Sequence, residues 1–97
     1  MSAYLVAFAD VKDVERFQAE YAAHTGAIIA KYGGKPICVT SSDNAKEGNF
    51  PPGNLVIVEF PDMEAAEGFY NDPEYKPLIA VRQSICDTHL GLFPGLE

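Results

Sequence analysis

The order of strand-like and helix-like segments constrains the fold of this chain more than any other feature of its sequence. Four short apolar runs bounded by turn residues are typical of β-strands: residues 4–10, 35–40, 55–60 and 88–93. Asp13 can cap a helix after the first run, and Gly33-Gly34 can end it. One stripe of that helix should face a core, because its members recur at three- and four-residue steps: Val14, Phe17, Tyr21, His24 and Ile28.

The segment between the last two runs predicts further helix. Asp62 can cap a helix over residues 63–71. Asp72 followed by Pro73 restarts a helix, but Pro77 would leave the Pro73 carbonyl without its donor, so this first turn should stand apart. The resulting order, β-α-β-β-α-β, predicts one ferredoxin-like α+β domain with both helices on one face of a four-stranded antiparallel sheet. A chain of 97 residues suits a single domain, so we assign residues 1–97 to it.

The predicted sheet has no polar face, although a sheet with helices on one side normally alternates apolar and polar residues. In the first and third strands both faces are mainly apolar: Tyr4, Val6 and Phe8 oppose Leu5, Ala7 and Ala9, and Leu55, Ile57 and Glu59 oppose Val56, Val58 and Phe60. Burying about six such side chains would contribute on the order of 10 kcal/mol before association costs. We therefore expect a homodimer through the open sheet face. The alternative is that the C-terminal tail or the 41–54 loop covers that face.

The charge balance and the cysteines limit the classes of partner and the compartment. Seven Lys and Arg against fourteen Asp and Glu give a net charge of −7, so we expect neither nucleic acid nor a membrane surface as a partner. The N-terminus lacks the basic region of a signal peptide and no stretch approaches the length of a membrane span, which favours a cytoplasmic protein. Cys38 and Cys86 should then be reduced and inert, with a disulfide between them as the alternative.

The sequence also resembles a known family. The opening strand, "YGG" after the first helix, "EGNFPPGNLVIVEFPDMEAAEGFYNDPEYKPL" and the following "VRQS" are similar to domain-of-unknown-function family 1330, within the dimeric α/β-barrel superfamily. The resemblance implies a ferredoxin-like protomer whose sheet pairs with a partner's sheet into a barrel. It implies no activity. It also aligns Arg82 with the arginine that the family carries after its "PEY" turn.

Glu59 and Arg82 are the first candidates for catalysis. Glu59 is a carboxylate near the end of a strand predicted to be central, and Arg82 is the only basic residue of the helix predicted from about Pro77 to near Cys86. Both are expected to reach one half-buried cleft, where they either pair with each other or hold a ligand carboxylate. A solvated carboxylate at the strand end is a third reading of Glu59.

Histidines and tyrosines complete the set of candidates. His24 is a catalytic candidate on the predicted apolar stripe, although a histidine there is more often a hydrogen-bonded core residue. His89 is a weaker candidate at the start of the last strand. Tyr21, Tyr70 and Tyr75 are predicted ligand-binding residues, with packing at the helix junction as the alternative for the last two.

Two functions are compatible with these residues. One is a cofactor-independent enzyme or binder of a small aromatic or carboxylated molecule, with its site in a cleft between sheet and helices. A set of polar residues would exchange protons with the bound molecule: Tyr21, His24, Glu59 and Arg82. The other is a non-enzymatic dimeric structural or interaction module. No P-loop, dinucleotide fingerprint, zinc motif or nucleophile elbow is present, so we expect no cofactor and no metal.

Overall fold

Caps and turns encoded in the sequence set the bounds of the elements. In the computed structural model, which describes residues 1–96, Asp13 caps the first helical region by accepting from the Arg16 amide, and Asp62 caps the next by accepting from the Ala65 amide. The elements follow in the order β1 (Ala3–Val11), α1 (Val14–Arg16), η1 (Phe17–Ala22), α2 (Ala23–Lys31), β2 (Lys35–Ser41), β3 (Asn54–Phe60), α3 (Met63–Tyr70), α4 (Lys76–Ile85) and β4 (Cys86–Pro94). The last strand begins directly after α4, two residues earlier than the sequence predicts.

The four strands form one antiparallel sheet in the order β2-β3-β1-β4. On the helix-covered face, the strand register places Leu5 of β1 opposite Val58 of β3 and Leu92 of β4. Phe60, Phe69 and other apolar side chains bury this face against the helices. The ferredoxin-like α+β fold predicted from the order of the segments is therefore confirmed.

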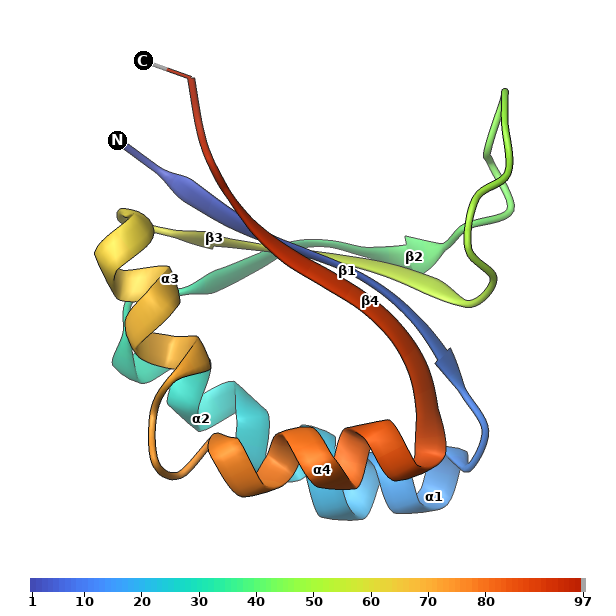
Figure 1. Cartoon of the computed structure of the whole chain (residues 1–97), viewed down its shortest axis with the longest axis horizontal. Coiled ribbons are helices and arrows are strands. Elements are labelled where there is room, and N and C mark those ends of the chain that lie inside the picture. The colour runs from blue at the N-terminus through green and yellow to red at the C-terminus, as the bar shows by residue number, and fades with distance from the viewer. Residues whose placement is uncertain (97) are drawn as a thin grey trace.

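All the helices lie on one side of the sheet, and the opposite face is open (Figure 1). Cross-strand pairs on this open face are Tyr4 with Glu59, Val6 with Ile57, and Phe8 with Leu55. The loop of residues 42–53 extends past the end of β2 and β3 and contacts the open face through Phe50, whose ring centroid lies 6.1 Å from that of Phe8. The apolar pair at the centre, Val6 and Ile57, is only half-buried within one chain.

The first helical region is continuous, but its middle part, η1, is a π-helix. Wider π turns rotate the helix that follows, so that Thr25 and Ile28 of α2 face the core. The predicted stripe is therefore wrong in part, because Val14 is 64% exposed and His24 is also exposed. Within residues 1–96, no helix combines the length and the apolar composition that crossing a membrane requires.

The turn between α3 and α4 stands apart from α4, as the prolines predict. Asp72 is buried and accepts hydrogen bonds from the Glu74 amide at 2.7 Å, from the Tyr32 hydroxyl at 2.6 Å and from Lys31 Nζ at 2.9 Å. The Tyr32 and Lys31 hydrogen bonds, followed by that of the Glu74 amide, lower the pKa of Asp72 to about 2. The carboxylate thus ties the end of α2 to the start of the α4 region.

Candidate functional site

Three polar side chains from distant parts of the sequence meet in the helix layer. Tyr21 comes from η1, Tyr75 from the turn before α4, and Arg82 from α4. The Tyr21 and Tyr75 hydroxyl oxygens are 2.6 Å apart, and Arg82 Nη1 donates to the Tyr75 hydroxyl at 2.7 Å. Tyr75 is 0% exposed and Arg82 only 5% exposed. We refer to this arrangement as the Arg–Tyr–Tyr chain.

Local packing explains why the sequence brings these groups together. The ring of Tyr75 packs on Phe69 with centroids 4.3 Å apart, which fixes its hydroxyl inside the helix layer. Arg82 follows Tyr75 by seven residues, about two helical turns, and so lies on the same side of α4. The guanidinium also stands 5.8 Å from the centroid of the Tyr21 ring, a distance that allows a cation–π contact.

The charge of Arg82 has no anionic partner inside the described part of the chain. Among residues 1–96 it forms no ion pair with a carboxylate, and its Nε has no hydrogen-bond partner. Burial acts to lower the pKa of Arg82, but the oxygens of Tyr75, Tyr21 and Tyr70 outweigh this effect and raise the pKa overall, so the group stays charged. A buried cation is costly unless it is paired, so this side chain is suited to receive an anion.

Burial raises the pKa of Tyr75, and the neighbouring phenol of Tyr21 raises it further. Tyr75 therefore remains a neutral phenol across the physiological range. The Arg–Tyr–Tyr chain thus carries one net positive charge, which comes from Arg82.

A cavity of about 230 Å³ separates the sheet from η1 and α2. Its walls are mainly apolar side chains of β1, β3, β4 and α3, among them Leu5, Val58 and Phe69. Tyr21 and Thr25 are the hydroxyl-bearing side chains on the wall. Tyr21 therefore belongs both to the cavity and to the Arg–Tyr–Tyr chain.

Glu59 is not part of this site. It alternates with the core residues Val58 and Phe60, so it lies on the open face, where it accepts from the Tyr4 hydroxyl at 3.3 Å. Arg82 lies in the helix layer on the other side of the sheet. The expectation that Glu59 and Arg82 reach one cleft is therefore wrong, and so is the expectation that they pair.

The two histidines also lie elsewhere. His24 is exposed in a groove between α2 and α4, beside Lys31 and Glu74. His89 is exposed on the open face, where it pairs across the strands with Phe8. In residues 1–96 no group of three or more His, Cys, Asp or Glu side chains is arranged to hold a metal ion.

The third tyrosine proposed from sequence lies at the edge of the site. The Tyr70 ring centroid is 6.0 Å from that of Tyr75, and Lys76 Nζ lies 5.1 Å from its centre. Sequence reasoning missed Thr25, which donates to the backbone oxygen of Tyr21 at 2.8 Å and lines the cavity. A threonine four residues after Tyr21 in the middle of a helix was the available signal.

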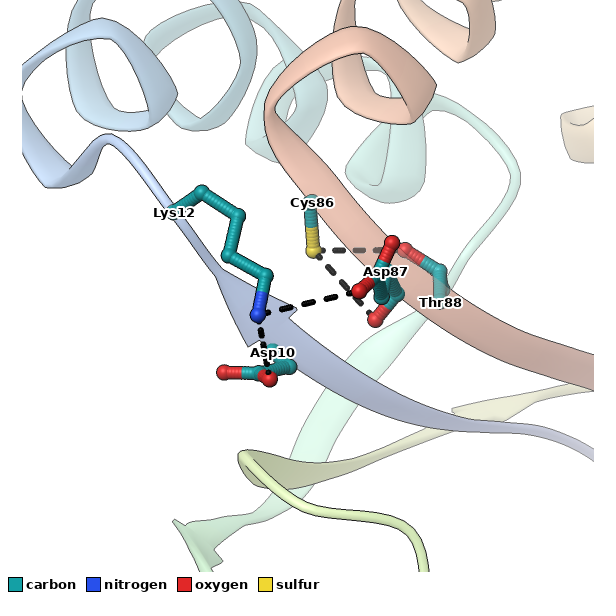
Figure 2. A network of polar contacts seen from close by, with 5 residues as sticks. All are labelled: Asp10, Lys12, Cys86, Asp87 and Thr88. Carbon is teal, nitrogen blue, oxygen red and sulfur yellow. Dashed lines mark hydrogen bonds and ion pairs between the residues drawn. The ribbon is translucent and has the colours of Figure 1, made fainter.

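A second polar cluster lies at the end of β1 and the start of β4 (Figure 2). Asp10 and Asp87 oppose each other across the two strands, and Lys12 Nζ lies 2.8 Å from the first carboxylate and 3.7 Å from the second. Nearby, Thr88 Oγ1 donates to Cys86 Sγ at 3.3 Å; this thiol, like that of Cys38, is free. The lysine offsets the repulsion between the two carboxylates, so a structural role accounts for this cluster.

Solved structures of several other proteins share this fold. A protein of unknown function from Rhodopseudomonas palustris is 18% identical with a TM-score of 0.79, and the alignment covers 99% of this chain and 83% of that chain. SnoaB, a cofactor-independent oxygenase from Streptomyces nogalater, is 18% identical with a TM-score of 0.68 over 99% of this chain and 94% of that one. A dimeric ferredoxin-like protein of unknown function from Thermobifida fusca is 12% identical with a TM-score of 0.54, over 98% and 92% of the two chains. At these identities the likeness concerns the fold alone.

Sequence comparison identifies the family. No curated protein sequence matches the chain. The profile of a domain of unknown function, DUF1330, matches residues 2–96, the same family that the sequence motifs resemble. The chain therefore belongs to the DUF1330 family.

Proposed function

We propose that this protein binds a small molecule with an acidic oxygen on a mainly apolar body, in the cavity between sheet and helices. The observation that carries the proposal is the buried Arg82 guanidinium, whose Nε has no partner within residues 1–96 and whose Nη1 bonds only to a phenol. Apolar pockets with a few convergent polar groups are typical of small-molecule sites. In this proposal Arg82, Tyr75 and Tyr21 form the polar end of the site, and Tyr70 supports it.

The size of the cavity supports a ligand with one or two rings. An apolar cavity of about 150 Å³ in another protein holds benzene. At about 230 Å³, this cavity has room for a substituted ring or a fused pair. Phe17 and Phe69 on its wall offer aromatic contacts to such a body.

The same site is suited to an enzyme that acts without a cofactor. A cofactor-independent oxygenase shares the fold, which supports this extension of the proposal. The chain of hydroxyl groups beside an apolar cavity can exchange a proton with a bound molecule. Because one fold hosts many chemistries, the proposal stops at binding and proton exchange and assigns no reaction.

The test is binding of small acids to wild type and to a pair of matched arginine variants. We expect aromatic acids and phenols to raise the melting temperature of the wild type, by an amount that corresponds to about 2.7 kcal/mol at a hundredfold excess over Kd. Arg82→Met should lose this stabilisation. Arg16→Met, which removes an exposed arginine paired with Glu20, should keep it. If no acid stabilises the wild type, or if the two variants respond alike, the proposal is wrong.

We also propose that two copies associate through the open face of the sheet. Apolar cross-strand pairs such as Val6 with Ile57 lie there with no helix over them. A second copy offers the same apolar surface, and the fold likeness to a dimeric ferredoxin-like protein supports this choice. A dimer that no small acid stabilises, either as wild type or as the Arg82 variant, would instead be the non-enzymatic module.

A further inference from the structure

Only one direction of the hydrogen bonds in the Arg–Tyr–Tyr chain gives the buried hydroxyl proton of Tyr75 an acceptor. A guanidinium can only donate, so the Tyr75 oxygen accepts from Arg82 Nη1. The proton of Tyr75, which is 0% exposed, then needs an acceptor. Within residues 1–96 the other polar neighbour of that oxygen is the Tyr21 hydroxyl at 2.6 Å, so Tyr75 donates to Tyr21.

This direction leaves the proton of Tyr21 free. Its oxygen accepts from Tyr75, and its own O–H is the one hydroxyl proton without an acceptor in the Arg–Tyr–Tyr chain. Arg82 Nε also lacks a partner within residues 1–96, but Arg82 does not line the cavity. The other hydroxyl on the cavity wall, that of Thr25, already donates to the backbone oxygen of Tyr21. Tyr21 is therefore the side chain that can offer a proton donor to a molecule in the cavity.

The positive charge at the far end strengthens that donor. Successive hydrogen bonds polarise one another, so the charge of Arg82 acts through Tyr75 on the Tyr21 proton. The titratable groups that face the guanidinium are the phenols of Tyr75, Tyr21 and Tyr70, and no carboxylate of residues 1–96 pairs with it. The Tyr21 hydroxyl, at the end of the Arg–Tyr–Tyr chain, thus favours a negatively charged acceptor.

The single hydroxyl donor of Tyr21 is best matched by a ligand that carries its charge on a single oxygen. A carboxylate would place its second oxygen against apolar walls such as Leu5 and Val58, where an unsatisfied charged oxygen is costly. A phenolate or an enolate carries its charge on a single oxygen attached to an apolar ring. Such an anion matches both the single donor and the apolar walls.

We infer that the ligand is a phenol or an enolisable ring ketone and that it binds as its oxyanion, with the Tyr21 hydroxyl donating to the charged oxygen. The ligand O–H, or the C–H of the ketone, loses its proton to solvent, and the positive charge of Arg82 balances the anion through Tyr75. This inference rests on the proposed cavity site and narrows its ligand class.

Three nitroaromatic probes of similar size test the inference on the full chain. They are 4-nitrophenol, whose anion absorbs visible light, the neutral ether 4-nitroanisole, and 4-nitrobenzoate with two charged oxygens. In wild type, we expect equilibrium dialysis to show the tightest binding for 4-nitrophenol, and the visible band to show that the bound form is the phenolate even below the midpoint of its free ionisation. This spectroscopic test is made on the wild-type protein alone.

Tyr21→Phe and Tyr4→Phe form the matched pair of variants. Tyr21→Phe should weaken 4-nitrophenolate binding by about ten- to a hundredfold, the loss of one hydrogen bond to a charged group. Its binding of 4-nitroanisole should not change, which also shows that the cavity remains folded. Tyr4→Phe removes the same atom from a tyrosine on the open face, on the other side of the sheet from the cavity, and should leave the binding of all three probes unaffected.

The outcomes separate this inference from the broader proposal. If 4-nitrophenol binds in its neutral form, or if Tyr21→Phe keeps the preference for the phenolate, the oxyanion inference is wrong while cavity binding stands. If 4-nitrobenzoate binds tighter than the phenolate and depends on Arg82, the single-oxygen argument fails and the broader proposal is supported. If none of the three probes binds, both are overturned.

Discussion

Tyr75→Phe tests the Arg–Tyr–Tyr chain by removing a single oxygen atom. The ring that packs on Phe69 is kept, but Arg82 loses the acceptor of its Nη1 and Tyr21 loses its hydrogen-bond partner. A hydrogen bond to a charged group contributes about 1.5–3 kcal/mol, and a buried charge left without a partner costs more. We therefore expect the variant to be about 2–4 kcal/mol less stable than wild type.

Tyr70→Phe is the matched control, because the Tyr70 ring lies beside Tyr75 and its hydroxyl forms no hydrogen bond with residues 1–96. It should stay within about 0.5 kcal/mol of wild type. Urea unfolding at one fixed protein concentration measures both variants, since association would shift the apparent stability. In thermal melts, each 1 kcal/mol should shift the midpoint by about 4–8 °C for a domain of this size.

A double-mutant cycle shows whether the cost comes from the charge. In an Arg82→Met background the hydroxyl of Tyr75 serves only Tyr21, so Tyr75→Phe should cost about 0.5–1.5 kcal/mol, the value of an ordinary hydrogen bond. A Tyr75→Phe variant as stable as the Tyr70→Phe control would refute the reasoning. So would an equal cost in the two backgrounds, because Arg82 would then not depend on Tyr75.

Three further predictions concern other parts of the molecule. Light scattering at micromolar concentration should give twice the 10.5 kDa chain mass for wild type but 10.5 kDa for Ile57→Asp, which places a charge at the centre of the open face. Val39→Asp, on the helix-covered face, is the control and should remain a dimer; a monomeric wild type would contradict the proposed dimer. Because the pKa of Asp72 falls from 3.8 to about 2 on folding, its contribution to stability should be complete above about pH 4 and lost as the pH falls through 2; urea unfolding of Asp72→Asn should lack this dependence. In hydrogen exchange, amides of residues 42–53 should exchange faster than those of residues 55–60, and equal rates would count against a mobile loop.

The order and bounds of the elements could be predicted because they depend on local chemistry. Asp13 and Asp62 accept hydrogen bonds from the first turns that they precede, and both aspartates are visible in the sequence. The π-helix could not be predicted in this way. It places Tyr21 against Tyr75, a residue 54 positions away, and this long-range contact is absent from any local pattern. The exposed position of His24 follows from the same rotation of the helix.

The error over Glu59 and Arg82 has a different cause. The shared cleft is expected because Glu59 ends a central strand and Arg82 lies on a helix that covers the sheet, but strand alternation places Glu59 on the face opposite to that of Val58 and Phe60. In most sheets polarity tells which face the helices cover. Here both faces of β3 are mainly apolar, so polarity could not assign the faces, and only the three-dimensional structure does so.

The two apolar faces also explain how one small sheet can serve two proposed roles. Within β3, Val58 lines the cavity while the residue before it, Ile57, lies at the centre of the open face. Cavity and proposed dimer interface therefore share a backbone but no side chain of this strand. Binding and association should then be separable by substitutions at adjacent positions, unless the backbone itself shifts when a second copy covers the open face. In that case the affinity for a ligand would depend on protein concentration, because the two equilibria would be linked through the sheet.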